Sequence, residues 1–260
     1  MPASNTELMI VELSVKVDSS IKLVQSIGSV LHGLIMESIS PAYAQELHTY
    51  SIRPYSQFLY FDKEKQVYLW RVAAFTRESV ERLVRVIYEL PDSVFLKQKN
   101  GYLYVMGRKI LEETNYQELV SRFLTESSEY RAVDLRFMSP TTFKVDGRYA
   151  IYPEAFRIYR YLLKRWNLFS SCEHMESEDL LQAIESASRV RYYALQTQKF
   201  GLEGVYINGF KGKFILDFKY NLIMRKVMAL LSYYAQYTGV GIKTALGMGG
   251  VFVELEEEKR

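Results

Sequence analysis

Residues 239–250 of this 260-residue chain read GVGIKTALGMGG, a stretch with five glycines and one Lys-Thr pair. Glycine adopts backbone conformations that other residues avoid and lets a second backbone approach closely, at an entropic cost. Successive backbone N–H groups beside a lysine are suited to hold an anion, most often a phosphate. The alternative is a tight helix-to-strand connection, which needs only one or two glycines. A Walker P-loop is excluded, because its glycine and lysine spacing differs.

The bulk composition is that of an ordinary globular protein, with 48% apolar and 24% charged residues. The net charge is only +3, so a site for a polyanion must come from local clustering of basic side chains. Tyrosine is abundant, with 21 residues beside 14 phenylalanines. Their flat rings offer stacking surfaces for nucleic-acid bases, although most aromatic side chains pack internally.

Cysteine and histidine are scarce. Cys172 is single, so no intramolecular disulfide is expected, which fits a reducing compartment. His32, His48 and His174 are scattered, which argues against a Cys/His zinc site; we expect neither a metal nor another cofactor. The N-terminal residues lack the regions of a signal peptide, and no apolar run is long enough to span a bilayer. The sequence therefore predicts a soluble, cytoplasmic protein with no membrane contact.

The first half of the chain predicts the order β-α-β-β-α-β. Period-two alternation over 9–17 indicates a half-buried strand, and Ser19 or Ser20 is expected to cap the following helix. Ser40-Pro41 begins a short second helix that ends at His48. The later elements are expected as strands near 56–62 and 66–74, a helix around 80–87, and strands at 93–98 and 102–106.

The polar stretch 125–129 is the expected linker, and the same order recurs after it. The helix at 221–237 should turn Ile223, Val227, Leu230, Leu231 and Tyr234 inward. The other elements are expected as strands near 131–137, 189–199, 204–210, 213–218 and 251–253, a helix at 153–167, and a short helix near 177–187. The strands at 204–210 and 213–218 are expected to form a hairpin about Lys211-Gly212. The predicted fold is α+β, with ferredoxin-like (RRM-like) domains at 1–124 and 129–260 and a C-terminal glycine-rich loop.

Several further short motifs occur along the chain before the glycine loop. They are Leu31-His32-Gly33, Leu47-His48 followed by Arg53-Pro54-Tyr55-Ser56, Phe137 to Phe143 around Ser-Pro-Thr-Thr, and Gly209-Phe210-Lys211-Gly212. Together they resemble the signature of the CRISPR repeat-processing endoribonucleases, the Cas6 family of the RAMP superfamily. The resemblance covers nearly the whole chain and implies tandem ferredoxin-like domains.

This resemblance implies cleavage of the CRISPR precursor transcript inside each repeat, without a metal ion. The 2′-hydroxyl upstream of the scissile bond attacks phosphorus and the 5′-oxygen leaves, giving 2′,3′-cyclic phosphate and 5′-hydroxyl ends. Such a reaction needs a base, an acid and a cation near the developing charge. The alternative is a non-cleaving RNA-binding subunit of a CRISPR effector complex, which needs no histidines near the loop. Effector subunits and a second copy of the chain remain open as partners beside the repeat RNA.

Three residues are the catalytic candidates. His48 aligns with the family's usual catalytic histidine, and its place at a helix end favours a cationic, proton-donating imidazole. His32 resembles a histidine found in some relatives, and it is expected either to activate the 2′-hydroxyl or to hold the phosphate. Tyr43 is expected to orient a histidine or the sugar. His174, in an insert, is expected to take no part.

The candidate RNA-binding residues are basic side chains and loop glycines. Arg53 stands near the position where some relatives carry a lysine, and as an arginine it can stabilise a phosphorane but is a poor proton carrier. The other candidates are Lys144, Arg148, Lys211, Lys213, Gly241, Lys243, Thr244, Gly247 and Gly249. Arg157, Arg160, Lys164 and Arg165 are spaced as a basic stripe along one helix, unless that face is simply solvated.

Overall fold

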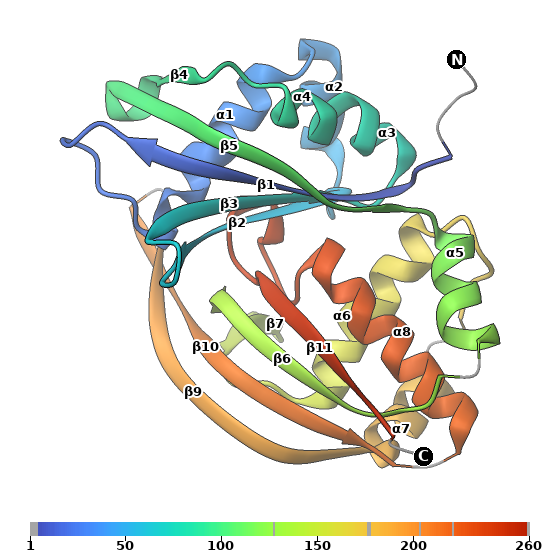
Figure 1. Ribbon diagram of the computed structural model, residues 1–260. Coiled ribbons are helices and arrows are strands. Elements are labelled where there is room, and N and C mark those ends of the chain that lie inside the picture. The colour runs from blue at the N-terminus through green and yellow to red at the C-terminus, as the bar shows by residue number, and fades with distance from the viewer. Residues whose placement is uncertain (1–4, 127, 176–177, 203, 220, 259–260) are drawn as a thin grey trace.

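The computed structural model describes residues 5–126, 128–175, 178–202, 204–219 and 221–258. Within these ranges two antiparallel sheets organise the chain (Figure 1). The first sheet has the order β2 (Tyr55–Asp62), β3 (Val67–Ala74), β1 (Leu8–Val17), β5 (Gly101–Thr114) and β4 (Ser93–Leu96). The second has the order β11 (Val251–Glu257), β6 (Tyr130–Thr141), β10 (Val205–Phe218) and β9 (Ser188–Leu202).

Helices cover both sheets. The outer face of the first sheet carries α1 (Gly28–Ser38), α2 (Pro41–Thr49) and a helical segment that runs through α3 (Arg77–Ser79), η2 (Val80–Val84) and α4 (Arg85–Tyr88). The second sheet packs against α6 (Ala155–Phe169), α7 (Glu178–Ala187) and α8 (Leu222–Thr238). Helix α8 also contacts β1, β2 and β3, so it lies between the two sheets (Figure 1).

Strand β1 is central because both of its faces are buried. Met9, Val11, Leu13 and Val15 pack beneath the outer helices, whereas Leu8 and Ile10 join the core that α8 shares. This is the period-two pattern of the sequence, with each set of side chains facing its own hydrophobic cluster. The hydroxyl of Tyr116 in α5 (Tyr116–Val120) lies 2.9 Å from that of Tyr234 in α8, so the core crosses the predicted domain boundary. The two halves thus share core contacts, and the division into two domains at residues 125–129 stays a prediction.

Two local predictions about turns and caps are wrong. Helix α1 begins at Gly28 after the 3₁₀ turn η1 (Gln25–Ile27), so neither Ser19 nor Ser20 caps it. Strand β10 is continuous from 205 to 218, and no turn occurs at Lys211-Gly212. The register against β6 shifts there instead, between Phe210 and Gly212, and Gly212 has φ +129°. The pairing with β9 is unbroken at this point, and a side chain on Gly212 would meet the carbonyl oxygen of Ala194 on β9 at 2.1 Å. A glycine inside a strand commonly marks such a bulge.

Other helices and strands agree with the predictions made from the sequence, and some were not predicted. Ser40 caps α2 through its hydroxyl, which accepts from the backbone N–H of Tyr43 at 3.4 Å, and Pro41 takes the first turn. Ile223 is 74% exposed and does not face inward, unlike Leu230 and Leu231. The elements that the sequence did not predict are α5, η4 (Ser121–Thr125), β7 (Phe143–Val145) and β8 (Arg148–Ala150). Among the described helices, none is long and apolar enough to cross a membrane.

Candidate functional site

The glycine loop, residues 239–250, is wedged between the two halves of the molecule. Gly241 has φ +82°, and a side chain added to it would lie 2.3 Å from the carbonyl oxygen of Thr142. A side chain on Gly250 would lie 2.2 Å from the ring of Phe58 on β2. Glycine is therefore required at both positions, one for the backbone conformation and the other for close approach.

Part of the loop backbone is occupied by internal hydrogen bonds. The N–H groups of Val240, Ile242 and Gly249 donate to backbone carbonyls, and that of Gly250 donates to the Ser139 hydroxyl. Among the described residues, no acceptor is found for the N–H groups of 241, 243, 244 and 245. The predicted anion-binding amides are thus confined to 241–245. Gly247 serves packing instead, since a side chain there would meet the Cα of Gly28 at 3.0 Å.

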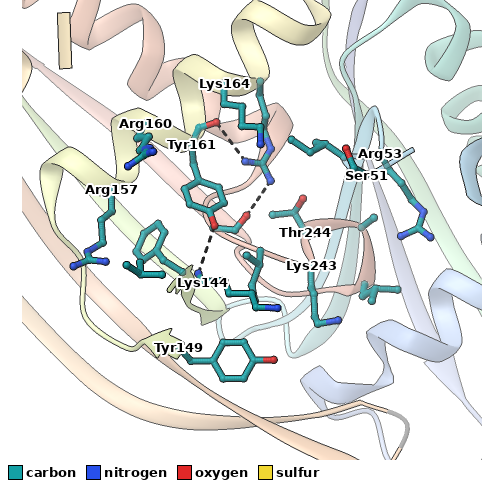
Figure 2. A pocket seen from close by; sticks show the side chains of 18 of the residues that line it. Ser51, Arg53, Lys144, Tyr149, Arg157, Arg160, Tyr161, Lys164, Lys243 and Thr244 are labelled. Carbon is teal, nitrogen blue, oxygen red and sulfur yellow. Dashed lines mark hydrogen bonds between the residues drawn. The ribbon is translucent and has the colours of Figure 1, made fainter. Parts of the chain in front are cut away.

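A cavity of about 830 Å³ opens between this part of the loop, α6 and the β7–β8 hairpin. Its basic lining residues are Arg53, Lys144, Arg157, Arg160, Lys164, Arg165 and Lys243. Figure 2 labels all of these except Arg165 around the cavity, with Arg53 opposite Arg157 and Arg160. The lining carboxylates in the described part are Asp146 and Glu154, and Glu154 is paired with Arg157. The cavity wall therefore has a large local excess of positive charge. Because the net charge of the chain is small, a site for a polyanion needs such local clustering of basic side chains.

Arg165 differs from the other cations because it is only 4% exposed. Its Nη2 donates to the carbonyl oxygen of Gly241 at 2.9 Å, while its Nε is buried with no partner among the described residues. Burial lowers the pKa of this guanidinium to about 10. All four residues of the predicted basic stripe thus line the cavity, and the buried Arg165 also holds the loop through the carbonyl of Gly241.

His32 lies on α1, where it is partly buried. Its Nδ1 is 2.6 Å from the hydroxyl oxygen of Tyr55, and the two rings are nearly parallel, with an interplanar angle of 13°. The pKa of His32 is lowered to about 4, mainly by burial and in addition by the positive charges of Arg53 and His48. These electrostatic effects place Arg53 and His48 close to His32.

His48 lies in the last turn of α2 and is exposed to solvent. Arg53 lines the basic cavity, and its charge also acts on His32. Its Nε is buried without a partner, and it forms no ion pair within the described part of the chain. The guanidinium is therefore available to an anion from solution.

Tyr43 does not reach either histidine. The side chain is fully buried in the core under the outer helices, and its hydroxyl has no hydrogen-bond partner among the described residues. The guanidinium of Arg82 lies 4.3 Å above its ring. The predicted contact of Tyr43 with a histidine or a sugar is therefore wrong, because its position on α2 turns it toward the core. Tyr55, from the start of β2, is the tyrosine that contacts His32, and neither spacing nor composition distinguishes it in the sequence.

The structure brings together only some of the predicted RNA-binding residues. Gly241, Lys243, Thr244, Lys144 and Arg53 line the cavity. Those that lie outside its lining are Arg148, Lys211, Lys213, Gly247 and Gly249. The Lys213 ammonium pairs with Asp134 on β6 at 2.7 Å, and burial lowers the pKa of Lys211. Both lysines lie on a continuous strand instead of a hairpin tip, which is why they fall outside the site.

Gln57 joins the loop to the helix that carries His32. It is 1% exposed, and its Nε2 donates to the carbonyl oxygens of Gly28 at 2.7 Å and Ala245 at 3.2 Å. Its Oε1 accepts from the indole of Trp70 at 2.9 Å. The first residue of α1 and the cavity-lining segment of the loop are therefore held by one amide.

Comparisons with known proteins all point to one protein family. The family model described as "CRISPR-associated endoribonuclease Cas6" matches residues 135–251. A Mycobacterium tuberculosis protein of that description is 24% identical over 244 residues, covering 93% of this chain and 77% of the relative. A Streptococcus thermophilus protein of the same description is 26% identical over 239 residues, covering 90% and 93%.

Solved structures show the same fold. A Cas6 product complex has a TM-score of 0.79 at 21% identity, covering 96% of this chain and all of the other. The Cas6 of Thermus thermophilus gives a TM-score of 0.72 at 20% identity, with the same coverage. The family model over residues 135–251 and the relatives aligned over about nine-tenths of the sequence make this chain similar to the CRISPR-associated endoribonuclease Cas6 family, whose fold it shares.

Proposed function

We propose that this protein is a metal-independent endoribonuclease that cleaves CRISPR precursor RNA within its repeats. The observation that carries the proposal is that Arg53, whose charge acts on His32 as that of His48 does, lines a cavity with seven basic residues and two carboxylates in its described part. The solved relatives include product and substrate-mimic complexes, which supports repeat RNA as the ligand. The orders β2-β3-β1-β5 and β9-β10-β6-β11 match strand for strand, which supports two tandem ferredoxin-like units.

The cavity and the free loop amides bind the RNA backbone in this proposal. Lys144, Lys164 and Lys243 neutralise phosphates, and the N–H groups of 243–245 donate to phosphate oxygens. These contacts fix the register of the RNA on the protein but read no sequence. The exposed ring of Tyr149 at the cavity edge offers a face on which a base can stack (Figure 2).

The reaction proceeds by attack within the RNA. The 2′-oxygen forms a bond to phosphorus and its proton leaves to solvent, while the bond from phosphorus to the 5′-oxygen breaks and that oxygen keeps the electron pair. His48, as imidazolium, gives a proton to the leaving 5′-oxygen and is reprotonated by solvent. Arg53 stabilises the negative charge that develops on the phosphorane oxygens. The products are a 2′,3′-cyclic phosphate and a 5′-hydroxyl end.

The proposal predicts cleavage of a cognate repeat RNA in the presence of EDTA. The test compares the wild type with His48→Ala, on substrates that carry either ribose or 2′-deoxyribose upstream of the scissile phosphate. Losing the proton donor is expected to slow single-turnover cleavage by about 10²–10⁴-fold, and the deoxy substrate should not be cut. Both RNAs should still bind, because neither change removes a phosphate contact.

His174→Ala serves as the matched control, since His174 is an exposed histidine that does not line the cavity. It should cut at the wild-type rate. If His48→Ala also cuts at that rate, His48 is not the proton donor. If the wild type binds repeat RNA tightly and never cuts it, the protein is a non-cleaving RNA-binding subunit.

A further inference from the structure

The buried hydroxyl of Tyr55 has a single hydrogen-bond partner. Tyr55 is fully buried, and the 2.6 Å contact with Nδ1 of His32 is the only hydrogen bond of this hydroxyl within the described residues. A buried hydroxyl without an acceptor is costly, so the phenol proton must point to that nitrogen. Burial raises the pKa of Tyr55 well above its ordinary value, so the phenol keeps this proton. Nδ1 of His32 is therefore the acceptor of the pair.

This hydrogen bond determines where the imidazole carries its own proton. A neutral histidine has one N–H group, so a ring that accepts at Nδ1 carries its proton on Nε2. The surroundings keep His32 neutral, because burial and the nearby charges of Arg53 and His48 oppose an imidazolium. Nε2 has no hydrogen-bond partner among the described residues. His32 therefore presents one unpaired N–H group beside Arg53.

We propose that Tyr55 holds His32 in the Nε2–H tautomer, so that His32 donates a hydrogen bond to a non-bridging oxygen of the scissile phosphate and transfers no proton. The inference rests on the proposed function and assigns a role within it. Nε2 cannot accept the proton of the 2′-hydroxyl, because it already carries one. A fixed N–H donor at the phosphate stabilises the charge that appears as the new bond to phosphorus forms. Tyr55 is a positioning residue, and His48 is the proton carrier.

Substitution by glutamine separates a hydrogen-bond donor from a proton carrier. The side-chain amide of glutamine offers an N–H donor near the place of Nε2 but has no basic nitrogen. We expect His32→Ala to lower the single-turnover rate constant by about 10²–10³-fold, the usual effect of losing such a donor. His32→Gln should stay within about tenfold of the wild type, since the donor is kept. His48→Gln should be as slow as His48→Ala, because an amide cannot carry the proton.

The tautomer itself is measured without RNA. Nitrogen-15 spectra of the imidazole rings contain only three histidines, and His32→Gln identifies the signals of His32. Between pH 7 and pH 5.5 they should show a protonated Nε2 and an unprotonated Nδ1. Tyr55→Phe removes the hydroxyl and keeps the ring, so it should give a mixture of both tautomers and a slower reaction at unchanged RNA affinity.

Two outcomes overturn the inference. One is an Nδ1–H tautomer or an imidazolium for His32 in that pH range. The other is a His32→Gln protein that cleaves as slowly as His32→Ala while the wild type cleaves normally, which leaves the proposed function intact. If the wild type cuts no repeat RNA, the proposed function fails, whereas the spectra still decide the tautomer.

Discussion

At the scale of single residues, the two histidines occupy contrasting surroundings. His32 is partly buried and hydrogen-bonded to a phenol, whereas His48 is exposed at the end of a helix. Groups that take different roles in one reaction need environments that separate their proton affinities. Burial and the charge of Arg53 act on His32 before any RNA is bound. The asymmetry between the two histidines is thus built into the free protein.

The lowered pKa of His32 predicts a pH dependence of stability. In the unfolded chain His32 titrates near its ordinary value of 6.5, whereas in the folded protein it titrates near 4. As the pH falls through 6.5, the unfolded state binds a proton that the folded state does not, so stability is lost and the loss levels off near pH 4. At pH 5 this amounts to at most about 2 kcal/mol.

Urea unfolding of the wild type and of His32→Gln at pH 7 and pH 5 measures this loss. The wild type should lose more stability than the variant over this range, and His174→Gln, at an exposed histidine, should behave like the wild type. Equal losses in the wild type and His32→Gln would mean that the native state binds the proton as readily as the unfolded chain.

At the scale of elements, the glycine loop depends on close approach as much as on conformation. Gly241 and Gly147 share a left-handed backbone, with φ values of +82° and +78°. A side chain on Gly241 meets the Thr142 carbonyl at 2.3 Å, whereas nothing lies within 4 Å of one on Gly147. The two positions thus differ in packing and not in backbone strain.

This pair predicts unequal costs for the same substitution. Gly147→Ala should lower the free energy of unfolding by about 1–2 kcal/mol, the penalty of a left-handed conformation. Gly241→Ala should cost about 1–3 kcal/mol more, because the loop must move away from Thr142. It should also weaken RNA binding, since residue 241 lines the cavity. Urea unfolding measures both costs; equal values would contradict the role of close approach.

Hydrophobic periodicity and capping residues predicted most strands and helices, as β1 and α2 illustrate. They failed at β10, since a glycine in a bulge resembles a turn until the pairing with the partner strand β6 is known. They also failed to separate Arg165 from its neighbours, because spacing along a helix does not reveal the Gly241 carbonyl 76 residues away. The sequence therefore predicted Arg53, Lys144 and the loop as parts of the cavity wall, but not the contacts of Tyr55 and Gln57, which arise from the tertiary fold.

At the scale of the whole molecule, the net charge of +3 conceals one strongly basic region. Of the cations that line the cavity, only Arg157 forms an ion pair within the described part of the chain. Binding of RNA there should release counterions, so the affinity should fall steeply with salt.

Arg160→Ala combined with Lys164→Ala should flatten this salt dependence. For single-stranded RNA, the slope of the logarithm of the binding constant against the logarithm of the salt concentration is about −0.7 for each phosphate that the protein neutralises. Losing two phosphate contacts should therefore make this slope less steep by about 1.4. Lys109→Ala, at an exposed lysine on β5 outside the cavity, should leave it unchanged. Filter binding from 50 to 300 mM salt measures the slopes, and an unaltered slope in the double variant would place the RNA elsewhere.

The amide of Gln57 reaches a loop residue 188 positions later in the chain, so the site exists only after a very long segment has been made. A ribosome that adds 5–20 residues per second needs about 10–40 s to travel from one partner to the other. During that time His32 and His48 have already been made, but the loop that completes the basic cavity has not. Under the proposed function, a growing chain therefore carries both histidines in an inactive form, and cleavage begins only when the loop closes onto α1.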